Sequence, residues 1–237
     1  MPEVVAFDES GRWLLLGDGG EAIGFDADLS TWIDVLPQYA VLQEREVATV
    51  AEHLARGVPD RRLERFPALY DDVLDRALPV GPEVVGRLRG FRERFVSRCD
   101  ELNGYGIPAT VQHDDLHGGN VHRQGETTRI LDWGDACISH PFLTLYVTFI
   151  HLDEVMADDR LKARLRDAYL GPWGPNAELR DAFDLACRLG PFAHLFKELR
   201  VLDAVPLAGR ALLVPDLPAI LQQCVSEIER SENASGD

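Results

Sequence analysis

The sequence predicts an α+β fold that is mainly helical. Two short β-prone runs near the N-terminus, 3–7 and 12–16, are separated by Asp8-Glu9-Ser10-Gly11 and indicate a hairpin. A second pair of runs, 121–123 and 127–131, flanks Gln124-Gly125-Glu126, where glycine can supply the turn. Most of the remaining chain carries apolar residues at the spacing of amphipathic or buried helices. At 237 residues the chain can bury a sizeable core.

Composition narrows the class of protein. The net charge of −16 argues against nucleic acid as a partner, because a phosphate backbone needs a basic surface. The same charge would favour a cationic small molecule, and it serves solubility equally well. No apolar run approaches the roughly 20 residues that span a bilayer, and the N-terminus has no signal-peptide pattern, so we expect a cytoplasmic enzyme with no membrane partner. The four cysteines are scattered without a C-x-x-C pair, and we expect them to be free and mostly buried.

The first half of the chain after the hairpin predicts four helices. A short helix over 29–36 would be capped by Asp28 or Ser30, and a longer amphipathic one follows over 38–56. The helix over 63–78 is weaker, because Pro67 must lie near its start. Gly81-Pro82-Glu83 opens the next helix, which runs to about residue 102.

The second half is also helical. Ser139-His140-Pro141 caps a strongly apolar run over 142–152, and a charged helix over 158–170 ends at Gly171-Pro172. Further helices are predicted over 178–189, 191–201 and 215–229. We therefore divide the chain into an N-terminal hairpin and linker (1–22), a helical body (23–230) and a disordered tail (231–237).

The stretch 111–136 concentrates the chemistry. Asn120 and Asp132 lie at the open end of the second hairpin, and paired strands run about 4.8 Å apart. An amide oxygen and a carboxylate placed there could reach one Mg²⁺ ion, which takes hard oxygen ligands and completes its shell with water and phosphate. Asp115 precedes Asn120 across a turn that contains Gly118-Gly119, and it is the candidate to face a substrate hydroxyl. Asp and Asn in glycine-rich turns also often bond only their own backbone.

The spacing His113-x-Asp115-x4-Asn120, followed by Asp132-Trp133-Gly134, fits the catalytic and metal-binding signature of protein-kinase-like enzymes. H-D-D-L-H-G-G-N-V and I-L-D-W-G-D-A resemble most closely the aminoglycoside phosphotransferase and choline kinase family. The resemblance implies the C-terminal lobe of a protein-kinase-like fold and transfer of the γ-phosphoryl group of ATP or GTP to a hydroxyl of a small molecule. It implies Asp115 as the catalytic base, Asn120 and Asp132 as Mg²⁺ ligands, and His113 and His117 as supports of the loop.

By the same resemblance, Leu16, Gly17 and Asp18 would form the hinge that meets the adenine ring, and residues 1–22 would be a remnant of an N-terminal lobe. No glycine-rich phosphate loop precedes this point. The chain has two lysines, Lys162 and Lys197, and both follow Asp132. A late start, a fragment and true loss of the lobe all explain this pattern. A hairpin with few supporting strands invites self-association.

Two other functions compete with the phosphotransferase. One is a non-catalytic binding or scaffold protein of the same fold. The other is a metal-dependent phosphohydrolase, in which His113 and Asp114 join His53 or His117 as ligands to a transition metal. The acceptor stays open among aminoglycosides, choline-like amines, macrolides, sugars and amino-acid alcohols, since the variable helices that would bind it offer no code.

Overall fold

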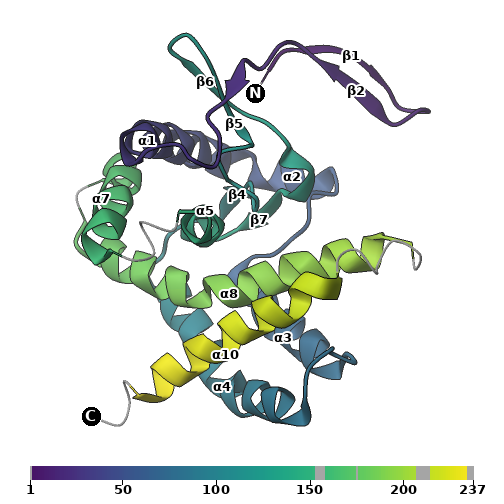
Figure 1. Cartoon of the computed structure of the whole chain (residues 1–237), viewed down its shortest axis with the longest axis vertical. Helices are drawn as coiled ribbons and strands as arrows, with labels where there is room; N and C mark the ends of the chain where they lie inside the picture. Colours follow the sequence, from purple (N-terminus) through teal and green to yellow (C-terminus); the bar gives the residue numbers. More distant parts are fainter. Residues whose placement is uncertain (1, 153–157, 175, 207–213, 234–237) are drawn as a thin grey trace.

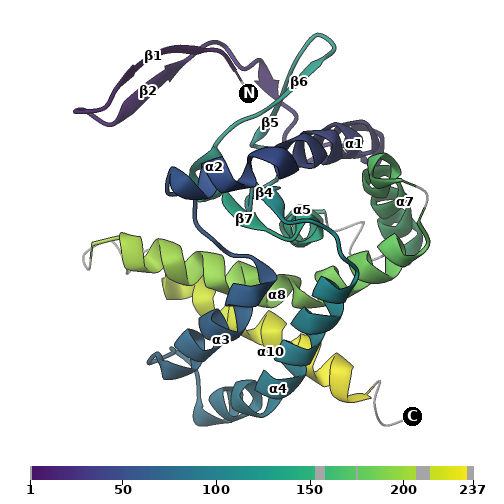
Figure 2. The ribbon, with the colours of Figure 1, turned by 180° about the vertical axis from the view of Figure 1, so that it is seen from behind.

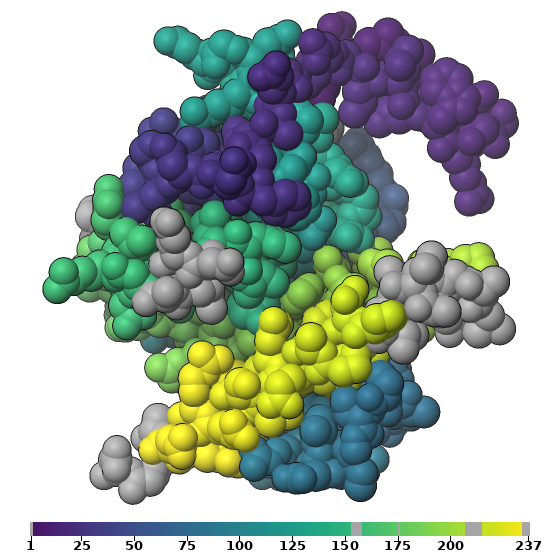
Figure 3. Space-filling view, viewed as in Figure 1, coloured from purple at the N-terminus to yellow at the C-terminus, as the bar shows by residue number. Residues whose placement is uncertain are grey.

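The computed structural model describes residues 2–152, 158–174, 176–206 and 214–233, and it begins with the predicted hairpin. Strand β1 (Val4–Asp8) pairs antiparallel with β2 (Trp13–Leu16). Figures 1 and 2 show this hairpin projecting from the helical body, and in the space-filling view of Figure 3 it stands away from the rest of the chain. Its large apolar side chains are exposed: Val4, Val5, Phe7, Trp13, Leu14, Leu15 and Leu16.

Two small sheets frame the stretch 111–136. Strand β3 (Glu21–Ala22) pairs with β5 (Val121–Gln124), which pairs with β6 (Thr127–Ile130), as the predicted second hairpin requires. Strand β4 (Thr110–Gln112) pairs with β7 (Cys137–Ser139). One loop, 113–120, runs from β4 to β5, and another, 131–136, runs from β6 to β7. Because both ends of the two loops are joined by strand pairing, the loops lie side by side.

Two helices run through prolines at which we predicted breaks. Helix α1 (Leu29–Glu46) contains Pro37, and α8 (Glu178–Ala204) contains Pro191. A proline inside a helix removes one hydrogen bond and clashes with the preceding turn. In α1 the apolar side chains of Leu36 and Tyr39, which lie before and after the proline, are fully buried, and in α8 Pro191 itself is buried. Burial of these apolar faces outweighs the local penalty, so the predicted division at each proline is wrong.

The helix predicted over 38–56 is not continuous: its first part belongs to α1, a 3₁₀ turn follows over Val47–Thr49, and its last part is α2 (Val50–Ala55). The other predicted helices are present, some of them shorter than predicted. They are α3 (Phe66–Asp75), α4 (Pro82–Gly104), α5 (Leu145–Ile150), α7 (Asp159–Leu170) and α10 (Leu217–Asn233). Asp28 caps α1 by accepting a hydrogen bond from the backbone N–H of Thr31 at 2.8 Å. Helix α10 continues to Asn233, three residues into the segment predicted as a tail, and residues 234–237 lie outside the described part.

Helix α8 crosses the middle of the body and packs against α3, α4, α5, α7 and α10 (Figure 1). Its Phe192 and Phe196 join Phe66, Tyr70 and Phe95 in an aromatic cluster, with ring centroids 4.5 to 6.2 Å apart in the contacting pairs. This packing fixes the face of α8 that meets the two loops. Within the described ranges, no helix has both the length and the apolar character needed to cross a membrane.

Candidate active site

The loop 113–120, here called the Asp115 loop, is fastened to buried elements. The backbone N–H of His113 donates to the Tyr39 hydroxyl of α1 at 2.9 Å, and the Thr148 hydroxyl of α5 donates to the carbonyl of Leu116 at 2.8 Å. The His113 ring is fully buried, and its Nε2 lies 2.6 Å from the carbonyl of Leu131. Burial lowers the pKa of His113 more than that hydrogen bond and the nearby carboxylates raise it, so the ring is neutral at pH 7. These contacts hold the backbone around Asp115 in one conformation.

The Asp115 carboxylate is partly exposed and already has donors on both oxygens. Oδ1 lies 3.4 Å from Nζ of Lys197 on α8. Oδ2 lies 3.4 Å from the Asn120 side-chain nitrogen and 3.3 Å from Nε2 of His117. With 30% of its side chain exposed, Asp115 can still meet a hydroxyl that approaches from solvent.

His117 supports the loop from within. Its Nδ1 accepts a hydrogen bond from the backbone N–H of Gly119 at 3.1 Å, and its ring stacks on Phe25 at 4.8 Å between centroids. Gly118 allows this packing, because a Cβ at that position would lie 1.8 Å from the carbonyl oxygen of Gly24. The glycine pair therefore serves a close approach between the Asp115 loop and residues 24–25.

Asn120 and Asp132 lie at the junction of the two loops. The carbonyl of Asn120 accepts a hydrogen bond from the backbone N–H of Leu131 at 2.9 Å, which places Asn120 beside the residue that precedes Asp132. The side-chain nitrogen of Asn120 donates to the carbonyl of Asp115 at 2.9 Å. Its amide oxygen makes no hydrogen bond with any residue that the structure describes.

Asp132 differs from the other aspartates of the two loops in its lack of a partner among the described residues. Like Asp114, whose φ is 65°, it has a positive φ (57°), a left-handed conformation that is uncommon outside glycine and that often marks a functional position. Its side chain is exposed and has no hydrogen bond or ion pair within the described part of the chain. An uncommitted carboxylate and an amide oxygen from the adjoining loop are hard donors of the kind that suit Mg²⁺.

The predicted hinge lies next to this junction. Leu16 ends β2, the backbone N–H of Gly17 donates to the carbonyl of Glu3 at 2.8 Å, and the carboxylate of Asp18 accepts from Gly20 at 2.9 Å. The segment that follows packs on the β5–β6 hairpin, since a Cβ at Gly19 would meet the Leu131 side chain at 3.0 Å. The hinge and the Asp132 loop (131–136) are therefore neighbours in space. A role in binding adenine stays a prediction.

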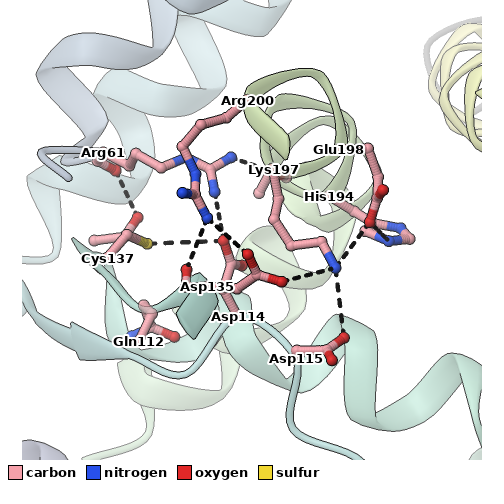
Figure 4. A network of polar contacts seen from close by, with 12 residues as sticks. Arg61, Gln112, Asp114, Asp115, Asp135, Cys137, His194, Lys197, Glu198 and Arg200 are labelled. Atoms are coloured by element: carbon pink, nitrogen blue, oxygen red, sulfur yellow. Dashed lines mark hydrogen bonds and ion pairs between the residues drawn. The ribbon is translucent and has the colours of Figure 1, made fainter. Parts of the chain in front are cut away.

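Three cations that the sequence reasoning did not assign converge on the two loops (Figure 4). Arg61 pairs with the buried Asp114, Lys197 contacts Asp115, and Nη2 of Arg200 lies 2.8 Å from Oδ1 of Asp135. They lie 53, 82 and 65 residues from their partners, so spacing along the chain could not identify them. A lysine inside the apolar run 191–201 was the one available signal, because lysine is rarely buried without a partner.

The arrangement does not favour a transition-metal site. His53 lies 2.7 Å from Oε2 of Glu46, and the Asp114 carboxylate is taken by Arg61. No group of three or more His, Cys, Asp or Glu side chains within residues 2–152, 158–174, 176–206 and 214–233 is arranged to hold a metal ion. The geometry instead combines a carboxylate that can face a hydroxyl with two neighbouring hard oxygen donors.

The chain matches the phosphotransferase enzyme family over residues 11–183. It is similar to the solved structure of an ethanolamine kinase from Plasmodium vivax, with 12% identity and a TM-score of 0.55, over 97% of this chain and 66% of that one. It is also similar to a choline/ethanolamine kinase family protein from Mesorhizobium loti, with 14% identity and a TM-score of 0.58, over 96% of this chain and 76% of that one. Curated proteins give no match.

The two solved structures establish the fold, which is protein-kinase-like as predicted. This chain spans just under two thirds of the length of the ethanolamine kinase. The stretch matched by the family includes β3, both loops and the two strand pairs that frame them. The chain therefore belongs to the phosphotransferase enzyme family.

Proposed function

We propose that this protein transfers the γ-phosphoryl group of ATP or GTP to a hydroxyl of a small molecule. The observation that carries the proposal is that the four aspartates of the two loops differ in whether they have a cationic partner. Asp114, Asp115 and Asp135 each have a cationic partner, whereas Asp132 has none within the described residues and lies beside Asn120. A site that neutralises three carboxylates and leaves one exposed has a place for one external cation.

In this proposal Asp115 accepts a hydrogen bond from the acceptor hydroxyl and then takes its proton. The hydroxyl oxygen forms a bond to the γ-phosphorus, the bond to the bridging oxygen breaks, and the electron pair leaves with the nucleoside diphosphate. Positioning accounts for most of the rate in such a transfer, since the protein supplies little covalent chemistry. The contacts from Tyr39, Thr148 and His117 would keep the Asp115 loop in place.

Asn120 and Asp132 would hold Mg²⁺ through the amide oxygen and the carboxylate. When bound, the ion would offset negative charge on the phosphates. His113 would keep the two loops in register through its contact with Leu131, and its neutral ring leaves the local charge unchanged. Leu16, Gly17 and Asp18 would meet the base of the nucleotide.

Replacement of Asp115 by asparagine tests this function. Loss of a general base should lower the turnover number by about 10²- to 10⁴-fold, while binding of the nucleotide persists. Asp132→Ala should abolish the Mg²⁺ dependence of nucleotide binding. Glu126→Gln, an exposed acid in the turn of the β5–β6 hairpin, is the matched control and should behave like the wild type.

The assay is release of ADP or GDP by the purified chain with a panel of alcohols. Turnover of the Asp115→Asn or Asp132→Ala variant close to that of the wild type would contradict the assigned roles. Binding of nucleotide without turnover by any acceptor would favour the alternative of a non-catalytic binding protein of this fold.

A further inference from the structure

The ammonium group of Lys197 lies among three carboxylates at the proposed site. Its Nζ is 2.8 Å from Oε1 of Glu198, 3.4 Å from Oδ1 of Asp115 and 3.9 Å from Oδ2 of Asp135. Figure 4 shows it between these three acids, which come from α8 and from both loops. Only 7% of the Lys197 side chain is exposed. A cation is thus built into the protein next to the carboxylate that would receive the acceptor hydroxyl.

This ammonium is charged and fixed in place. Burial lowers the pKa of Lys197, but the hydrogen bond to Glu198 and the charges of the surrounding carboxylates outweigh it and raise the pKa above its ordinary value. Its neighbours on α8, Phe196 and Leu199, are 5% and 4% exposed and belong to the core. The side chain therefore starts from a rigid segment of helix, and moving its charge away would remove a cationic partner from both Asp115 and Glu198.

The other carboxylates around Lys197 also have partners. Asp135 is paired with Arg200 at 2.8 Å, and Oε1 of Glu198 lies 3.4 Å from Nε2 of His194. An amine that arrived beside Asp115 would find these acids already paired. It would also stand close to the charge of Lys197, because a hydroxyl that bonds Asp115 brings its neighbouring carbon atoms within a few ångströms of that ammonium.

We propose that Lys197 occupies the position that the ammonium of an amino alcohol would need, so that this site takes hydroxyl compounds without a positive charge. The inference concerns the acceptor and therefore rests on the proposed function. The net charge of −16 would attract cations toward the protein as a whole, but that attraction is largely screened beyond about 8–10 Å. Within the site, the charge of Lys197 determines whether a cationic acceptor can bind.

A binding experiment tests the inference without turnover. Lys197→Ala removes the ammonium and leaves Asp115, Asp135 and Glu198 around an open space, where ethylammonium should bind at least about tenfold more tightly than to the wild type. The control is Lys162→Ala, which removes the only other lysine in the chain and lies on α7. Titration calorimetry and thermal shift with ethylammonium chloride measure the difference. Equal binding by the wild type and a folded Lys197→Ala variant would overturn the proposal.

A second measurement needs no folded variant. Because the chain has two lysines, the side-chain ¹⁵N spectrum of the wild type holds two ammonium signals, and the buried Lys197 should give the one that exchanges slowly with water. Glycerol and serinol differ by one hydroxyl and one ammonium. We expect that a titration with serinol leaves the Lys197 signal unchanged, because the proposal gives a second ammonium no position beside Asp115. A saturable shift of the Lys197 signal by serinol, or its displacement into fast exchange, would overturn the proposal.

Turnover gives the third measurement. In the wild type with ATP and Mg²⁺, kcat/KM for glycerol should exceed that for serinol by at least about tenfold. Lys197→Met should narrow or reverse this ratio, and Lys162→Met should preserve it. Phosphorylation of serinol as efficient as that of glycerol refutes the inference. Absence of turnover with every alcohol refutes the proposed function instead. The two binding measurements then test by themselves whether Lys197 occupies the position that an acceptor ammonium would need.

Discussion

Replacing Arg61 by methionine should destabilise the fold far more than the same replacement at its neighbour Arg62. Arg61 is 5% exposed, and its guanidinium donates to the Asp114 carboxylate and, at 2.6 Å, to the carbonyl of Ala193 on α8. Arg62 also forms an ion pair, at 2.8 Å to Asp60, but 38% of its side chain is exposed. The two residues are adjacent in the chain and carry the same charge, so they differ mainly in burial.

The expected magnitudes follow from that difference. Removing one partner of a buried ion pair costs about 3–5 kcal/mol, because the other charge is left without compensation. An exposed pair contributes roughly 0–1 kcal/mol. Arg61→Met should therefore lower the free energy of unfolding by about 2–5 kcal/mol more than Arg62→Met. The Asp114 carboxylate cannot readily move into solvent when Arg61 is replaced, since the backbone of Asp114 holds a positive φ of 65° inside the Asp115 loop.

Urea unfolding of the wild type and both variants at pH 7 measures the free energies. A difference between the two variants below about 1 kcal/mol at pH 7 would refute the reasoning.

Two further predictions concern Glu198 and the N-terminal hairpin. Burial raises the pKa of Glu198, but hydrogen bonds from His194 and Lys197 and the charge of Lys197 outweigh it and bring the pKa to about 2. The difference in the free energy of unfolding between the wild type and Glu198→Gln should be fully present above the unfolded pKa of about 4.3 and disappear as the pH falls toward 2. Acid-unfolding curves of the two proteins measure this difference. A difference that is independent of pH would contradict the prediction. Phe7 and Trp13 are 67% and 51% exposed on a two-stranded hairpin, so we expect concentration-dependent association that serine at both positions reduces. A wild-type chain that stays a monomer in light scattering at high concentration would argue against it.

Local sequence signals predicted most of the elements but not their lengths. Asp28, Pro67 and Pro82 act at helix starts, where capping and the fixed φ of proline depend only on neighbouring residues. Pro37 and Pro191 carry the same local preference against helix interiors, yet α1 and α8 continue through them. There the outcome depends on burial against distant elements, which no local pattern contains. Strands β3, β4 and β7 were missed because runs of two or three residues carry no periodicity.

The same distinction holds for the site. Asp115, Asn120 and Asp132 lie within 18 positions, so spacing and turn chemistry sufficed to predict that they share a hairpin junction. Arg61, Lys197 and Arg200 come from a loop and a helix that only the fold brings to those aspartates. The local sequence pattern therefore predicts the groups proposed for the reaction but not Arg61, Lys197 and Arg200, whose charges pair with three of the four aspartates.

The contact between Gly118 and Gly24 has a mechanical consequence. The backbone N–H of Gly24 donates to the carbonyl of Gly118 at 3.1 Å, and β3 just before it is paired with β5. Residues 21–25 are therefore joined to the loop that carries Asp115 by strand pairing and by this hydrogen bond. The connection from the N-terminal hairpin to the proposed base thus runs through backbone contacts of residues 21–25 and does not pass through the helical body.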